Sequence, residues 1–142
     1  MRISLSKIKK IKEHAKQVFP EECCGLLIGK AGFEPNGKVE NTVYAVLPCE
    51  NVLDGDKKTG FEISLSEVWK AEVKAREVGL EIVGNYHSHT DAGAYPSGDD
   101  EKHCKLYTSM LIISLGQGII EETKSWTVGI NKTVFEETIT FI

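Results

Sequence analysis

Three short apolar segments limit the folds that this chain can adopt: "CCGLLIGKA", "LEIVGNYH" and "MLIISL". Each is predicted to form a β-strand. The last two lack the strict alternation of a strand with one face in water, so we expect them to be central strands covered on both faces. "MLIISL" is also the longest apolar run, and it is far too short to cross a bilayer.

Two amphipathic helices are predicted to cover these strands. The first begins at a cap by Ser6 and ends near Phe19; the second begins at a capping box and ends at Gly79. Ser64 and Glu67 form that capping box. Apolar residues at helical spacing give each helix one buried face. The faces are Ile8, Ile11, Ala15 and Val18 in the first helix, and Val68, Ala71, Ala75 and Val78 in the second.

The remaining segments complete an α/β pattern. "VENTVYAVLPC", "FEIS", "KSWTVGI" and "TVFEETITFI" are predicted strands, and "DEKHCKLY" is a predicted short helix. We find no internal repeat and no linker, so the order of elements predicts a single domain over residues 1–142. Its expected fold class is α/β, a mixed β-sheet flanked by helices.

Composition argues against several classes of function. The net charge is −4, and the lysines of "SKIKKIKEHAK" alternate with apolar positions, so we expect no nucleic-acid partner. "MRISLSKIKKIKEH" lacks the apolar run of a signal peptide, and we expect a cytoplasmic location and no membrane partner. The absence of a CxxC pair favours free, mostly buried thiols at the four cysteines, Cys23, Cys24, Cys49 and Cys104.

The segment "NYHSHTDAGAYPSGDD" holds the residues most suited to metal chemistry. Residues two apart in a strand point to the same side, so His87 and His89 can direct both imidazoles at one ion. Asp100 follows a glycine-rich loop that can return it to the pair. Two histidines and one carboxylate leave a fourth tetrahedral position for water, which is typical of catalytic rather than structural zinc sites.

A water activated by zinc needs a base to take its proton and pass it to a leaving amine. "PEECCGLLIG" offers Glu21 and Glu22 at the start of a buried strand. Ser97 offers a hydroxyl that can donate to the oxyanion of a tetrahedral intermediate. Ser97 and Asp100 are also spaced as a capping box for the helix that follows, and both roles remain open.

The spacing H-x-H, seven residues, S, two residues, D resembles the signature of the JAMM (MPN-plus) zinc metallopeptidases. Residues 87–89, "HSH", match the H-[ST]-H element, and Ser97 and Asp100 complete the pattern. The family also carries a glutamate three residues before a glycine that opens an apolar run, and "ECCGLLIG" has Glu22 there. The similarity extends through Asn51, "FEIS" and "IVGNYHSH", and so covers nearly the whole chain.

The resemblance implies a fold, a cofactor and a reaction. The family's mixed sheet between helices is related to that of the cytidine deaminases. One zinc ion per chain would be held by His87, His89 and Asp100, with Glu22 as general acid and base and Ser97 as the oxyanion-stabilising residue. The implied reaction is hydrolysis of amide or isopeptide bonds at the C-terminal tail of ubiquitin-like proteins.

The chain differs from many family members at Thr90, where they have proline after the second histidine. It also has little room for the insertions with which eukaryotic members grip ubiquitin, and so it resembles the compact bacterial and archaeal members. Those are associated with ubiquitin-like proteins, including sulfur carriers ending in Gly-Gly. Such a protein is therefore the partner implied by the resemblance.

Two other functions are compatible with this fold or site. A non-catalytic MPN-type scaffold would bind ubiquitin-like partners, but such relatives have generally lost ligands, whereas all five positions are intact here. A hydrolase of small acylated amines or cysteine conjugates would use the same site. Cys24 is more simply a buried thiol than a nucleophile. His103 can support Asp100, and Tyr95 can either line the substrate groove or hold its loop in place.

Overall fold

The structure is a computed structural model that describes residues 1–142. Its three helices are α1 (Leu5–Val18), α2 (Leu65–Glu77) and α3 (Gly98–His103). Its eight strands are β1 (Arg2–Ile3), β2 (Cys24–Lys30), β3 (Thr42–Cys49), β4 (Glu81–Thr90), β5 (Ser109–Gly116), β6 (Ile119–Val128), β7 (Val134–Glu137) and β8 (Thr140–Phe141).

All eight strands belong to one mixed sheet, in the order β7-β6-β5-β4-β2-β3-β1-β8. β4 runs parallel to β5, and the short β1 runs parallel to β3 and β8. The other neighbouring strands are antiparallel. The predicted central place of "LEIVGNYH" and "MLIISL" is confirmed, because β4 and β5 each have a neighbour on both sides.

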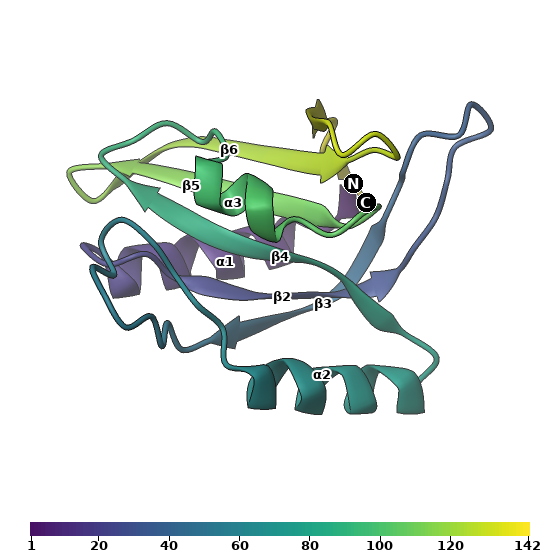
Figure 1. Ribbon diagram of the computed structural model, residues 1–142, viewed down its shortest axis with the longest axis horizontal. Helices are drawn as coiled ribbons and strands as arrows, with labels where there is room; N and C mark the ends of the chain where they lie inside the picture. The colour runs from purple at the N-terminus through teal and green to yellow at the C-terminus, as the bar shows by residue number, and fades with distance from the viewer.

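The helices cover the two faces of this sheet, with α1 behind it and α3 in front of it in Figure 1. α1 packs Ile11 against Leu27 and Leu111 on one face. α2 packs Ala71 and Leu26 together on the opposite face. The expected fold class, a mixed sheet flanked by helices, is confirmed. The functional residues predicted from the sequence lie on the face covered by α2 and α3.

One helix start and one position of a buried helix face differ from the prediction. The N-cap of α1 is Ser4, not Ser6, because the Ser4 carbonyl accepts the first helical hydrogen bond, from the backbone N–H of Ile8 at 3.2 Å. Ser64 caps α2 as predicted, with its side chain accepting from the backbone N–H of Glu67. Val78 lies beyond the last turn of α2 and is 71% exposed, so it is not part of the buried face.

The predicted strand "FEIS" is extended but joins no sheet. The backbone N–H of Glu62 bonds to the Asn51 side chain, and the Glu62 carbonyl accepts from Val52. These local partners replace a neighbouring strand. "TVFEETITFI" is not one strand but two, because β7 pairs with β6 while β8 pairs with β1 at the far edge of the sheet. β1 itself is too short for its pattern to be recognised in the sequence.

A close approach of two backbones fixes the centre of the sheet. At Gly84 in β4, an added Cβ would lie 1.9 Å from the backbone oxygen of Ser109 in β5. Only glycine therefore fits where the parallel pair of strands begins. His87 and His89 lie in β4 a few residues after this glycine.

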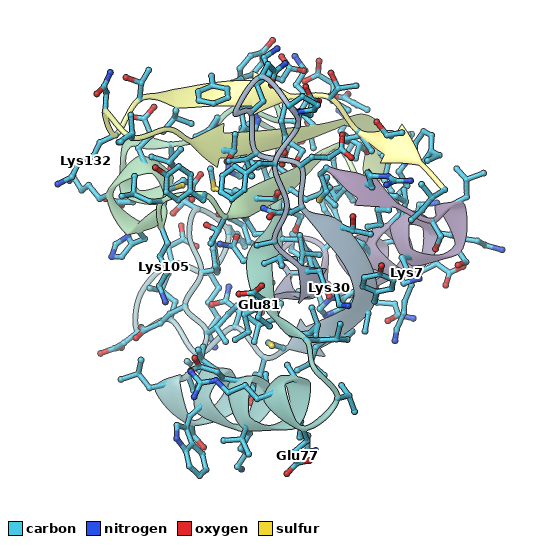
Figure 2. The ribbon with its side chains drawn as sticks, turned by 90° about the vertical axis from the view of Figure 1, so that its right-hand side faces the viewer. Lys7, Lys30, Glu77, Glu81, Lys105 and Lys132 are labelled. Carbon is cyan, nitrogen blue, oxygen red and sulfur yellow. The ribbon has the colours of Figure 1, made fainter.

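Most charged side chains lie on the outside of the sheet and its helices. Figure 2 shows Glu77 at the end of α2 and Lys132 in the turn between β6 and β7, both extending away from the body of the molecule. No helix is both long enough and apolar enough to cross a membrane.

We predict that Gly84→Ala lowers the free energy of unfolding by about 3 kcal/mol, because the new methyl group overlaps backbone that cannot move aside. Gly98→Ala is the matched control: nothing lies within 4 Å of its added Cβ, and the position is helical. It should leave stability unchanged or raise it by up to about 1 kcal/mol. Urea unfolding of both variants measures the difference, and equal midpoints would contradict the prediction.

Candidate metal centre and active site

The candidate site forms where β2 begins and β4 ends. The two strands are antiparallel, with Cys24 paired to His87, so the two residues that precede β2 meet the last residues of β4. Glu22, His87 and His89 are all buried there, 4%, 0% and 9% exposed. Their possible ligand atoms lie within 4.8 Å of one another, which makes them a candidate metal cluster.

Asp100 completes a triangle with the two histidines. Its Oδ2 lies 3.2 Å from Nε2 of His87 and 3.1 Å from Nε2 of His89, and the two Nε2 atoms are 3.1 Å apart. A tetrahedral ion with bonds of about 2.0–2.1 Å holds neighbouring ligand atoms roughly 3.3 Å apart. The three atoms therefore have the separation that a zinc ion requires.

Both imidazoles have Nε2 turned towards Asp100, and a backbone hydrogen bond fixes the ring of His89. Nδ1 of His89 donates to the carbonyl of Gly93 at 2.8 Å, which leaves the Nε2 lone pair free. His87 is stacked on Phe61, with ring centroids 4.5 Å apart, and complete burial lowers its pKa. Burial also acts to lower the pKa of His89, but hydrogen bonds with Asp100 and Gly93 outweigh it and raise the pKa.

Asp100 belongs to the capping box of α3, and its carboxylate also converges on the two histidines. Its backbone N–H donates to Oγ of Ser97, the N-cap of α3. Its Oδ2 accepts from the backbone N–H of Ser97 at 2.8 Å, and this is the same oxygen that faces both imidazoles. Burial acts to raise the pKa of Asp100, but these hydrogen bonds hold it well below its usual range.

Glu22 is a carboxyl group without a hydrogen-bond partner for its side chain. Its pKa is raised to about 8, chiefly by burial; the nearby His89 acts to lower it, and the charges of Asp100 and Asp56 add to the rise. Its backbone is held firmly, since its N–H donates to the carbonyl of Lys57 and its carbonyl accepts from Asn51. A fixed carboxyl whose pKa is near neutrality is suited to acid–base work.

A groove of about 640 Å³ leads to these groups. Residues 53–63 form one wall and residues 97–103 the other, while Asn85 and Met110 lie on the strands between them. Ser97 and His103 both line the groove. The site residues predicted from the sequence, Glu22, His89, Ser97 and Asp100, thus share one cleft, with His87 buried beneath it.

The structure shows what surrounds three further residues that the sequence suggested as aids to the site, Tyr95, Cys24 and His103. Tyr95 holds its loop in place, because its hydroxyl accepts from Lys124 at 2.8 Å and its ring packs near Trp126. Cys24 is buried, and burial raises the pKa of its thiol, so it is not an activated nucleophile. The N–H of the exposed His103 imidazole donates to its own helix, at the carbonyl of Asp99.

Phe61 and Asn51 have structural roles at the site that the sequence did not predict. Phe61 stacks on His87 from an extended segment that resembles a strand in sequence. Asn51 uses both ends of its amide: Nδ2 donates to the carbonyls of Glu22 and Gly60, and Oδ1 accepts from two backbone N–H groups, those of Leu53 and Glu62. One buried side chain thus ties a groove wall to the candidate base. An asparagine directly after a strand was the available signal.

Comparison with known proteins finds a matching family model and relatives named as peptidases or desampylases. Residues 5–129 match the family model described as prokaryotic homologs of the JAB domain. A desampylase from Pyrococcus furiosus is 31% identical over 81% of this chain and 72% of its own length. A CysO-cysteine peptidase from Mycobacterium tuberculosis is 36% identical over 63% of this chain, but the match spans only 55% of that protein.

A solved structure supports the fold. The solution structure of a Desulfitobacterium hafniense protein covers 99% of this chain, and the chain covers 92% of that protein, with a TM-score of 0.79 at 28% identity. The architecture built from β2, β4 and the two covering helices is therefore shared with a protein solved by experiment.

We predict that Asn51→Ala lowers the free energy of unfolding by about 2 kcal/mol, because it leaves buried backbone groups without partners. The amide hydrogens of Leu53 and Glu62 should then exchange faster than in the parent protein. Asn36→Ala is the control, since Asn36 makes its two hydrogen bonds in an exposed turn. Hydrogen exchange with mass spectrometry tests this; unchanged protection across residues 52–63 would contradict the role of Asn51.

Proposed function

The chain belongs to the prokaryotic JAB family, and from this premise we propose that it is a zinc-dependent peptidase. Its substrate is the C-terminal tail of a ubiquitin-like or sulfur-carrier protein, in which it hydrolyses an amide or isopeptide bond. The resemblance to the JAMM metallopeptidases that the sequence indicated is confirmed by the family match and by relatives named desampylase and CysO-cysteine peptidase.

One observation carries the proposal: the triangle formed by Nε2 of His87, Nε2 of His89 and Oδ2 of Asp100. Its sides of 3.1–3.2 Å agree with the roughly 3.3 Å between ligands of tetrahedral zinc. We assign these three residues as the ligands of one zinc ion per chain. When bound, zinc supplies Lewis acidity and lowers the pKa of water, which makes a nucleophile available near neutral pH.

Glu22 is the general acid and base of the proposed reaction. Its carboxyl group is buried beside the two histidines and has no competing hydrogen bond. As the carboxylate it accepts the proton of the attacking water. It then donates that proton to the departing amine, so the same group serves both steps.

Ser97 stabilises the oxyanion in this proposal. Its Oγ accepts from the backbone N–H of Asp100, which fixes the position of the hydroxyl and leaves its own hydrogen free to donate. The hydroxyl faces the groove beside the proposed metal ligands. A donor held there before the reaction begins stabilises the charge that develops on the carbonyl oxygen.

The groove suits an extended peptide tail. The backbone groups of Glu62 are bonded on one side, to Val52 and Asn51. Backbone groups of successive residues in an extended segment point in opposite directions, so those of Phe61 and Ile63 face the other way. Both residues line the groove. A tail that enters beside them gains backbone hydrogen bonds in the manner of an added strand.

The alternative of a non-catalytic scaffold has less support, because the residues proposed as ligands, base and oxyanion donor are all present and lie close together. We further infer that residues 1–142 form a single domain, since every strand belongs to one sheet. The cytoplasmic location expected from the sequence stays a prediction.

Metal binding can be tested without any substrate. We predict about one zinc ion per chain by elemental analysis of protein purified without a metal-affinity tag. Zinc at 100 times its Kd stabilises by about 2.7 kcal/mol, which raises Tm by roughly 9 °C for a chain of this length. His89→Ala should lose both the ion and the shift, whereas His103→Ala, a change in the same groove, should keep both. Equal zinc binding by His89→Ala would refute the assigned ligand set.

Catalysis is tested with a model carrier protein whose Gly-Gly tail is joined by an amide bond to a reporter. Glu22→Gln should retain zinc and lose about 10²–10⁴-fold in turnover, because only the proton acceptor is removed. Glu21→Gln changes the neighbouring carboxyl and should keep wild-type activity. Full hydrolysis by Glu22→Gln would rule out Glu22 as the base.

A further inference from the structure

Asn85 carries an amide in the groove that nothing in the chain satisfies. It is half-buried and lines the cleft, and its Oδ1 is fully buried without a hydrogen-bond partner. Leaving such a group unpaired costs about 1–3 kcal/mol. A leucine of similar size would avoid that cost, so folding alone does not explain an asparagine at this position.

Few other side chains share this condition. Unpaired buried polar atoms occur elsewhere on Asn41, His87 and Thr123. None of these three residues lines the groove, whereas Asn85 does. The contrast with Asn51, which uses both ends of its amide in bonds to the backbone, shows that a buried asparagine in this fold can be fully satisfied.

The position of Asn85 relates it directly to the proposed metal ligands. In β4, Asn85, His87 and His89 alternate with residues that face α1, so all three point to the groove side of the sheet. Two residues of a strand span about 6.7 Å, which is also the length of two residues of an extended peptide. A tail lying along β4 from the metal ligands therefore presents its second or third residue to Asn85.

We propose that Asn85 is a specificity-determining residue that binds the backbone of the substrate tail, about two residues from the scissile bond. The inference rests on the proposed function. In an extended peptide the N–H and C=O of one residue point to the same side. The side-chain amide offers one acceptor and one donor, and rotation about its soft Cβ–Cγ torsion turns both towards the groove.

Backbone recognition suits a tail that ends in Gly-Gly. Glycine has no side chain to fill a pocket, so its peptide groups are the features available for binding. Met110 and Ile63 share the groove with Asn85 and offer no polar side-chain group. Met110 is paired with Asn85 across β4 and β5, so the Asn85 amide supplies a directional contact beside an apolar side chain.

The test uses a short synthetic peptide ending in Gly-Gly, labelled at its amino end, and the zinc-loaded protein. Asn85→Leu should weaken peptide binding about tenfold, the effect of one or two hydrogen bonds. In the cleavage assay its KM should rise about tenfold while kcat changes less than about twofold. Its Tm should stay the same or rise, because an unpaired buried group has been removed.

Thr123→Val is the matched control, since it also removes an unpaired buried polar atom but lies outside the groove. It should leave Kd and KM at wild-type values. A second experiment replaces peptide N–H groups of the tail one at a time by N-methyl groups. Methylation at the residue that faces Asn85 should weaken binding to wild type about tenfold and have no further effect on Asn85→Leu.

Opposite outcomes overturn the inference. If Tm falls in Asn85→Leu and Kd is unchanged, the residue is structural. If cleavage is impaired while the free tail binds normally, Asn85 contacts the leaving group instead of the tail. A wild-type protein that cleaves Gly-Gly conjugates, together with an equally competent Asn85→Leu, refutes the inference and leaves the proposed function intact. A wild-type protein that neither binds nor cleaves them refutes both.

Discussion

The antiparallel pairing of β2 with β4 is the interaction on which the rest of the structure depends. It sets Cys24 opposite His87, and so brings the buried Glu22, two residues before Cys24, to the imidazoles at the end of β4. Cys23 and Ser88 reinforce this end of the pair, with bonds from the Cys23 N–H to the Ser88 hydroxyl and from the Ser88 N–H to the Cys23 carbonyl. The Glu22 carboxyl and the imidazoles of His87 and His89, distant in the sequence, are thereby held together by strand pairing.

Much of the fold and the candidate site followed from local sequence. Short apolar runs indicated the central strands, and the spacing of His87, His89, Ser97 and Asp100 predicted a metal site. In the structure the side chains of His87, His89 and Asp100 lie within 3.2 Å of one another. These features are local, because alternation along a strand decides which side chains share a face. Glu22 required the resemblance to a known family, since nothing in its own segment relates it to β4.

The remainder depended on partners that a sequence does not display. "FEIS" has the composition of a strand, yet the Asn51 side chain takes the hydrogen bond that a neighbouring strand would have received. "TVFEETITFI" divides because its two halves pair at opposite edges of the sheet. The unpaired amide of Asn85 is visible only once β4, β5 and the groove are in place. In each case the outcome depends on which hydrogen-bonding groups find a partner, and that is decided by the whole fold rather than by the local sequence.

Oδ2 of Asp100 takes part both in the candidate site and in the cap of a helix. The atom that faces the imidazoles also closes the N-terminal cap of α3, so one carboxylate serves both the site and the wall of its groove. Replacing Asp100 would remove the carboxylate from the site and also one of the two hydrogen bonds of the capping box, which leaves only the Ser97 hydroxyl to cap α3. A substitution at the centre of the site therefore also weakens the start of the helix that lines the groove.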